Sequence, residues 1–260
     1  MRIPLFAANW KMNQSIGEIS PYIEALSSRL QKFPGQLGKN YQVVIAPPAT
    51  HLQAMGAVIG GKGLELGAQN CGHTASGAFT GEISPKTLQE MQCNWVIVGH
   101  SERRHIYLET DAMIQGRLRG AFENQLKPIF CVGETLAERK AGKTESVVEG
   151  QLLVLKELKN HLTNQDWAIA YEPVWAIGTG ENASPQQAQE VHAFIRKWAK
   201  SHLSGPVAEK TRILYGGSVK PDNCSDLKRQ PDIDGFLVGG ASLQADSFGA
   251  IVENSLKIRS

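Results

Sequence analysis

The chain has 260 residues, 42% of them hydrophobic and 20% charged, which is ordinary for a soluble protein with a full hydrophobic core. Its formal net charge of +2 is too small to indicate nucleic acid or a membrane surface as a partner. The four cysteines lack CxxC spacing, which argues against a disulfide framework and a cysteine zinc site. With no signal-peptide pattern and no apolar segment of membrane-spanning length, we expect a cytoplasmic protein.

Eight short apolar runs predict β-strands, and helical patterns separate them. In chain order the expected strands are Ile3–Ala8, Tyr41–Ala46, Leu64–Gln69, Trp95–Val98, Pro128–Val132, Trp167–Tyr171, Arg212–Tyr215 and Gly235–Val238. Three helices are expected to begin where serine caps the helix and proline takes the first helical position, at Ser20-Pro21, Ser84-Pro85 and Ser184-Pro185. The other helices are expected at His51–Ile59, Asp111–Asn124, Val148–Leu162, Pro221–Lys228 and Asp246–Lys257.

The expected strands are continuous apolar runs rather than alternating ones, which is typical of strands buried on both faces of a parallel sheet. A closed barrel of eight βα units takes about 250 residues. The sequence therefore predicts the α/β class and a single (β/α)8 barrel that forms one catalytic domain over residues 1–260. The alternative, an open doubly wound sheet, usually has a GxGxxG turn after its first strand, and no such turn follows Ile3–Ala8.

The stretch Ala170–Gly180 places a carboxylate at a strand end and an apolar loop beyond it. Pro173 stops the strand directly after Glu172, because proline cannot donate a ladder hydrogen bond. The following Val-Trp-Ala-Ile run has no polar residue and is closed by Gly178 and Gly180. Such a loop suits a lid that excludes water from a general base, although an ordinary βα loop with a solvated glutamate explains the same stretch.

The carboxyl ends of all strands in a βα barrel open on one face, where the active site lies. The residues at these ends are therefore the candidates for function: Asn9, Lys11, His100, Glu172, Gly217-Ser218 and Gly239-Gly240. Each type has an ordinary explanation, since lysines are usually solvated, lone histidines are usually structural and glycine pairs usually mark turns. Their convergence on one rim favours an active site with a base, an imidazole, a cation and an amide.

The glycine-rich turns after the seventh and eighth strands predict a phosphate site, because such turns in this fold commonly bind phosphate through backbone N–H groups. Gly178 of the lid would close that site. The sequence has no pattern for a metal cluster, a nucleotide, a flavin or a nicotinamide, so we expect no cofactor and no metal. A base and an imidazole beside a small phosphate ester suit proton abstraction next to a carbonyl, with Lys11 stabilising the oxyanion.

Five motifs together resemble the triosephosphate isomerase family in order and spacing, from Phe6 to Ala241. They are Asn9-Trp10-Lys11-Met12-Asn13, Gly99-His100-Ser101-Glu102-Arg103-Arg104, Cys131-Val132-Gly133-Glu134, Ala170–Gly180 and Tyr215-Gly216-Gly217-Ser218-Val219. The resemblance implies a cofactor-free enzyme of glycolysis and gluconeogenesis. Such an enzyme interconverts dihydroxyacetone phosphate and D-glyceraldehyde 3-phosphate through an enediolate.

The resemblance also implies roles for residues at matching positions. Glu172 matches the family's catalytic base, His100 its neutral imidazole that polarises the carbonyl, and Lys11 its electrostatic residue, roles that are established for the family. Asn9 matches a residue that orients substrate, and Glu102 matches a carboxylate near the lysine and histidine. The matches to the family's phosphate-binding backbone are Gly178, Ser218, Gly239 and Gly240.

A homodimer is a further implication of the resemblance. The long, small-sided segment Asn70–Ile83 resembles the loop that inserts into a second subunit, with Thr80 near the partner's active site. Cys131 matches a recurrent cysteine whose role is packing rather than nucleophilic attack. The chain departs from the family at Glu181-Asn182-Ala183, where a lysine often comes first, and this departure leaves the lid-opening rate open.

Two other functions stay open from the residues alone. A Schiff-base aldolase on the same fold would use Lys11 as its nucleophile, although that class generally places its lysine within a barrel strand. A non-catalytic binding protein built on this fold is the third hypothesis.

Overall fold

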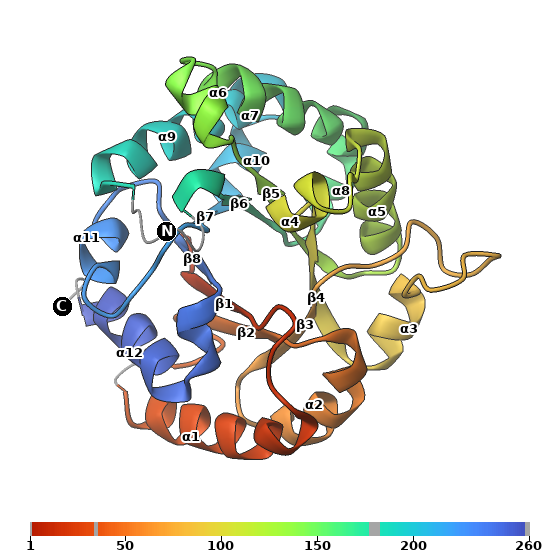
Figure 1. Cartoon of the computed structure of the whole chain (residues 1–260), viewed down its shortest axis with the longest axis vertical. Helices are drawn as coiled ribbons and strands as arrows, with labels where there is room; N and C mark the ends of the chain where they lie inside the picture. The colour runs from red at the N-terminus through yellow and green to blue at the C-terminus, as the bar shows by residue number, and fades with distance from the viewer. Residues whose placement is uncertain (1, 34–35, 177–182, 258–260) are drawn as a thin grey trace.

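The computed structural model describes residues 2–33, 36–176 and 183–257, and its centre is a closed barrel of eight parallel strands (Figure 1). The strands are β1 (Leu5–Asn9), β2 (Gln42–Ala46), β3 (Glu65–Ala68), β4 (Cys93–Val98), β5 (Lys127–Val132), β6 (Ala168–Tyr171), β7 (Arg212–Tyr215) and β8 (Gly235–Val238). Each strand pairs in parallel with the next along the chain, and β8 pairs with β1. The predicted (β/α)8 barrel is confirmed.

Helices form a ring outside the barrel (Figure 1). They are α1 (Ile19–Lys32), α2 (Leu52–Ile59), α3 (Pro85–Glu90), α4 (Ser101–His105), α5 (Asp111–Glu123), α6 (Leu136–Lys140), α7 (Thr144–Leu152), α8 (Lys159–Asn164), α9 (Pro185–His202), α10 (Gly205–Lys210), α11 (Cys224–Lys228) and α12 (Ala245–Leu256). Short 3-10 turns are η1 (Ile16–Glu18), η2 (Ala49–His51), η3 (Leu153–Leu158), η4 (Val174–Ala176) and η5 (Gly240–Leu243). In the described part of the chain, no helix has the length and apolar character needed to cross a membrane.

The alternation of side chains along each strand divides the apolar core into two layers. One layer fills the barrel interior with Leu5, Ala7, Val44, Ala46, Trp95, Ile97, Ile129, Cys131, Ala168, Ala170, Leu214 and Leu237. The alternate residues of the same strands, such as Phe6 and Ala8 of β1, pack outward against the helices. Both faces of the sheet are buried, which explains why the strands are continuous apolar runs in the sequence.

Two of the three predicted Ser-Pro helix starts are confirmed, and the first is wrong. Ser84 and Ser184 cap α3 and α9. In contrast, α1 follows η1 directly and begins two residues before Pro21. The Glu18 carboxylate accepts hydrogen bonds from the backbone N–H and the hydroxyl of Ser15, each at 2.7 Å, so the turn begins at this earlier pair. Proline fits within the first turn of α1 because the N–H groups there need no partner inside the helix.

Several other boundaries differ from the prediction. The helix expected over Val148–Leu162 consists of α7, η3 and α8, and the helix expected from Pro221 begins only at Cys224. The strand β4 begins at Cys93, before the expected Trp95. The helices α4, α6 and α10 were not predicted, because segments of five or six residues contain too few apolar positions to show a helical period.

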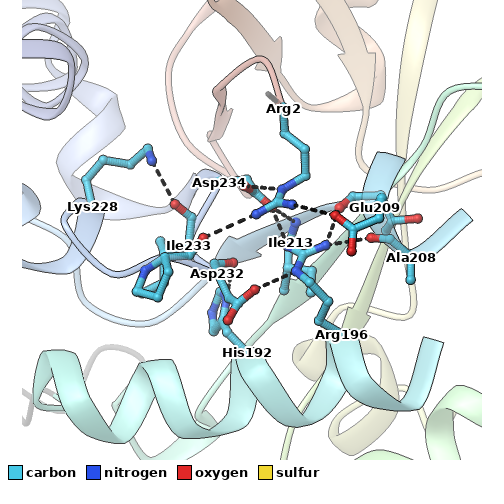
Figure 2. Close-up of polar contacts among 12 residues, drawn as sticks. Arg2, His192, Arg196, Ala208, Glu209, Ile213, Lys228, Asp232, Ile233 and Asp234 are labelled. Carbon is cyan, nitrogen blue, oxygen red and sulfur yellow. Dashed lines mark hydrogen bonds and ion pairs between the residues drawn. The ribbon is translucent and has the colours of Figure 1, made fainter. Parts of the chain in front are cut away.

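A network of charged side chains fixes α9, the helix that follows the loop after β6 (Figure 2). Arg196 of α9 donates to Asp232 at 2.6 Å and to Asp234 at 2.8 Å. The Asp234 carboxylate also accepts hydrogen bonds from the backbone N–H of Ile213 in β7 and from the Nε–H of Arg2. Because Arg2 precedes β1 and Asp234 precedes β8, the network lies at the amino ends of the strands, opposite the rim where function was predicted.

Candidate active site

A cavity of about 230 Å³ opens at the carboxyl ends of the strands. The predicted residues that line it are Asn9, Lys11, His100, Glu172, Ser218, Gly239 and Gly240. The structure thus brings the candidate side chains together with both predicted glycine-rich turns. Gly178, the remaining predicted phosphate-binding residue, lies outside the described residues.

Glu172 follows β6 directly, and its side chain is only 2% exposed. One carboxylate oxygen lies 2.9 Å from Nε2 of His100, and the other accepts the backbone N–H of Ser101 at 2.9 Å. Burial raises the pKa of Glu172. The bonds to His100 and Ser101, together with the charge of Lys11, outweigh burial and lower the pKa below its ordinary value. The carboxylate is therefore ionised at neutral pH in this conformation.

Two glycines leave room for Glu172. A Cβ atom at Gly133 would lie 1.8 Å from the Glu172 carbonyl oxygen, and one at Gly216 would lie 2.9 Å from its Cγ. Neither position at the ends of β5 and β7 accommodates a side chain without displacing the glutamate. The sequence analysis placed both glycines within motifs but did not predict this role.

His100 follows β4 after Gly99, whose φ of +74° lies in the left-handed region that favours glycine. The ring lies at the start of α4, where its Nδ1 accepts the backbone N–H of Glu102 at 3.2 Å. That bond places the proton of a neutral ring on Nε2, which faces Glu172. Burial lowers the pKa of His100, but the Glu172 and Glu102 carboxylates raise it, and the net shift is upward in this conformation.

Lys11 lies just beyond the end of β1 with a left-handed backbone, at φ +51°. The Asn9 side-chain oxygen accepts its backbone N–H at 3.0 Å. Its Nζ forms an ion pair with Glu102 Oε1 at 2.6 Å. The predicted neighbours Lys11 and Glu102 are thus in contact. The first residues of α4 supply the carboxylate that holds the ammonium, and His100, which caps α4, supplies the imidazole.

The turns after β7 and β8 present mainly backbone to the cavity. A Cβ at Gly217 would lie 2.2 Å from the Tyr215 hydroxyl, so this turn requires glycine. A Cβ at Gly239 would lie 3.4 Å from Cε of Lys11, which shows that the second turn lies beside the lysine. Lys220 also lines this side of the cavity, and the sequence analysis missed it because a lysine in a turn has no distinguishing pattern.

Metal and thiol chemistry receive no support from the described residues. Within residues 2–33, 36–176 and 183–257, no group of three or more His, Cys, Asp or Glu side chains could hold a metal ion. Cys131 is fully buried in the barrel interior, and burial raises the pKa of its thiol well above the ordinary value. A thiol in that environment packs rather than attacks.

Glu134 is a fully buried carboxylate that the sequence analysis did not place in the site. It accepts the Tyr171 hydroxyl at 3.0 Å and the indole N–H of Trp175 at 3.0 Å. Trp175 belongs to the predicted lid stretch, and Tyr171 is the last residue of β6. Through these two hydrogen bonds, Glu134 links the first part of that stretch to the end of β6. The rest of the predicted lid and the first two hinge residues, 177–182, lie outside the described residues.

The fold and the site define the class of the protein: a (β/α)8-barrel enzyme with a buried carboxylate, an imidazole and a lysine around one cavity. Residues 4–255 match the family model described as triosephosphate isomerase. The chain is 46% identical over 254 residues to the triosephosphate isomerase of Chloroflexus aurantiacus, with 97% of this chain and 99% of that protein covered. It is 47% identical over 258 residues to that of Herpetosiphon aurantiacus, with 97% and 99% covered. It is 46% identical over 241 residues to that of Taenia solium, with 92% and 93% covered. The chain therefore belongs to the triosephosphate isomerase family.

Proposed function

We propose that this chain interconverts dihydroxyacetone phosphate and D-glyceraldehyde 3-phosphate by moving a proton between adjacent carbons through an enediolate. The observation that carries the proposal is the buried Glu172 carboxylate beside Nε2 of His100, in a cavity that Lys11 and two glycine-rich turns also line. Membership of the family supports the same reaction.

Glu172 acts as the base in this proposal. It removes a proton from the carbon next to the substrate carbonyl, while the Nε2–H of His100 donates to the carbonyl oxygen that becomes the enediolate oxygen. Protonated Glu172 then returns the proton to the neighbouring carbon. The hydroxyl proton on the first carbon's oxygen passes to the former carbonyl oxygen through the His100 imidazole, so that a new carbonyl forms on the first carbon. Lys11 stabilises the negative charge, Asn9 orients the substrate, and Glu102 holds the Lys11 ammonium through their 2.6 Å ion pair.

Substrate binding changes the basicity of the carboxylate. Without substrate, Glu172 is bonded to His100 and to the N–H of Ser101, and both bonds lower its pKa. When His100 donates to the substrate and Glu172 turns toward the carbon, these bonds are lost and burial dominates. Since burial raises the pKa of a carboxyl, Glu172 becomes a stronger base once the substrate is bound.

The phosphate group lies at the turns after β7 and β8 in this proposal. The small residues of these turns let backbone N–H groups approach phosphate oxygens closely, and the second turn lies beside the Lys11 side chain. The backbone that binds phosphate belongs to Gly178, Ser218, Gly239 and Gly240. The loop after Glu172, from Pro173 to Gly180, forms a lid that excludes water, and its opening rate depends on the hinge Glu181-Asn182-Ala183.

We also infer a homodimer built around the segment Asn70–Ile83. This segment extends outward from the barrel between β3 and α3 (Figure 1). Its base is held by Arg117 of α5, which binds Glu82 at 2.6 Å, whereas Thr80 is exposed. Met12, close to the cavity, is 94% exposed. A second copy would bury both features and bring Thr80 near the partner's active site.

The remaining expectations concern the setting of the reaction. The whole chain, residues 1–260, works as one catalytic domain on a small-molecule substrate without a cofactor or metal. We expect the protein to be cytoplasmic, and its small net charge of +2 argues against nucleic acid or a membrane as a partner.

A coupled isomerase assay with the purified protein tests the proposal, and turnover of both triose phosphates is the expected result. The Schiff-base aldolase is disfavoured because Lys11 lies beyond the end of β1, whereas that class generally places its lysine within a barrel strand. Borohydride with a ketose phosphate would trap a covalent adduct on Lys11 only in the aldolase. Binding of triose phosphate without turnover would instead indicate the non-catalytic protein.

A further inference from the structure

We propose that Gln69 is a positioning residue for Lys11: its side-chain amide fixes the lysine backbone in the conformation from which the ammonium faces the cavity. The inference rests on the proposed function, because it deepens the role given there to Lys11. Gln69 is partly buried and lines a second cavity, which Asn9, Lys11 and His100 also line, but not the one that holds the catalytic carboxylate. Both hydrogen bonds of its side-chain amide go to backbone carbonyls, one of them that of Lys11, so we assign it an action through Lys11 rather than on the substrate.

The contacts of Gln69 join three neighbouring strand ends. Gln69 directly follows β3, and its Nε2 donates to the Lys11 carbonyl at 2.8 Å and to the Ala46 carbonyl at 2.9 Å. Ala46 is the last residue of β2, and its carbonyl also accepts the backbone N–H of Trp10 at 3.1 Å. Both N–H groups of one amide are thus used on backbone carbonyls, which links the end of β1 to β2 and β3.

The backbone of Lys11 requires such an external constraint. A non-glycine residue at φ +51° is in a sparsely populated region and stays there only when its surroundings hold it. The Asn9 side chain accepts the N–H of Lys11, and the Gln69 side chain donates to its carbonyl. The peptide groups on both sides of the Lys11 Cα are therefore restrained, which fixes φ and ψ together.

The direction of the lysine side chain follows from that backbone. With φ and ψ fixed, the starting direction of the side chain is fixed, and its ammonium lies 2.6 Å from Glu102 Oε1 in α4. Without Gln69, the carbonyl of Lys11 loses its restraint, and the residue can relax to an ordinary negative φ that swings the ammonium away. Misplacing a charged group by about 1 Å can cost on the order of 10²-fold in rate.

The variant Gln69→Met tests this role, because methionine keeps the length of the side chain and removes both donors. We expect kcat/KM to fall at least about tenfold, with a matching loss of affinity for 2-phosphoglycolate, a carboxylate and phosphate mimic of the enediolate. The matched control is Gln165→Met, which removes an amide-to-carbonyl bond to Phe122 at 3.1 Å, far from the site. The control should keep the parental kinetics.

A double-variant cycle separates positioning from a general structural role. In a Lys11→Met background, Gln69→Met should cause no further loss, because there is no ammonium left to position. Thermal unfolding and sedimentation of each variant show whether fold and assembly are kept, and Gln69→Leu repeats the test with a second side chain.

Three outcomes would overturn the inference. They are parental kinetics in Gln69→Met, an equal further loss in the Lys11→Met background, or failure of both Gln69 variants to fold, which would make the residue structural. An inactive parental protein would instead refute the proposed function itself, so the two failures are distinguishable.

Discussion

Glu172 is the residue on which the proposed reaction depends, and its two bonds show that the protein holds the carboxylate ready and ionised. The variant Glu172→Gln keeps the size of the side chain and removes the base. We expect kcat to fall by roughly 10²- to 10⁴-fold or more, the range that general bases contribute. Binding of 2-phosphoglycolate should persist, because the turns after β7 and β8 are unchanged. Substantial residual turnover would rule out Glu172 as the base.

Lys11 supplies a fixed positive charge in a partly exposed position, where its side chain is 26% exposed. We expect Lys11→Met to give a soluble protein that is weak in both substrate binding and turnover. The substrate dianion and the developing oxyanion would then lack their counter-charge. Steady-state kinetics at low salt check this expectation, since screening is smallest there. Parental KM and kcat under those conditions would contradict the proposed role of the lysine.

The sequence predicted the site residues that lie at a strand end or within two residues beyond it, because the fold class alone gathers strand ends on one rim. Asn9, Lys11, His100 and Glu172 were found in this way. Gln69 was missed because its partners are carbonyl oxygens, and any residue supplies a carbonyl whatever its side chain. No pattern of residue types therefore marks such a contact in the sequence.

At the scale of elements, the start of α1 shows how one local signal outweighs another. Ser20-Pro21 matched a favourable helix start, but the Ser15 and Glu18 pair lies earlier and begins a 3-10 turn that runs directly into the helix. Proline is tolerated anywhere in the first turn, so it marks the neighbourhood of a helix start and not its first residue. The sequence was sufficient to predict that the long helices and strands exist and which type each is. The residues at which they begin and end could not be predicted as well, because they depend on competition between such caps.

At the scale of elements, we predict that the segment Asn70–Ile83 is needed for the dimer. Removing residues 75–80 while keeping Cys71 and Glu82, which bind Arg117, should leave the barrel folded. We expect this variant to sediment as a monomer with poor activity, because the tip would no longer insert into a second copy. Far-UV circular dichroism serves as the control for folding. A shortened protein that still sediments as a dimer would refute the proposed contact.

At the scale of the whole molecule, His192 makes stability depend on pH. Its side chain is fully buried on α9, and its Nδ1 contacts the Asp232 carbonyl at 3.1 Å within the network of Figure 2. Burial lowers the pKa of His192 from its usual 6.5 to about 4. The unfolded chain thus binds this proton more readily than the folded one, and stability that is intact above pH 6.5 is lost as pH falls toward 4.

The variant His192→Asn tests this dependence, because asparagine also offers an N–H donor for the Asp232 carbonyl but does not titrate. The shift of the His192 pKa corresponds to about 3 kcal/mol across the window from pH 6.5 to 4, at about 1.4 kcal/mol per pH unit. Urea unfolding at several pH values should show that the free energy of unfolding falls more steeply with decreasing pH in the parental protein than in the variant. The expected difference is about 1.4 kcal/mol per pH unit between pH 6.5 and 4. Equal slopes in both proteins would show that His192 is not the acid-sensitive group.

Proton transfer between adjacent carbons is the central claim, and isomerisation in D₂O tests it most directly. D-glyceraldehyde 3-phosphate is converted in D₂O, and proton NMR of the dihydroxyacetone phosphate product reports deuterium on the carbon that receives the proton. We predict deuterium incorporation during turnover, because protonated Glu172 can exchange its proton with solvent before returning it. Both product and exchange should be lost in Glu172→Gln. Turnover that proceeds without any deuterium in the product and survives this substitution would contradict the account.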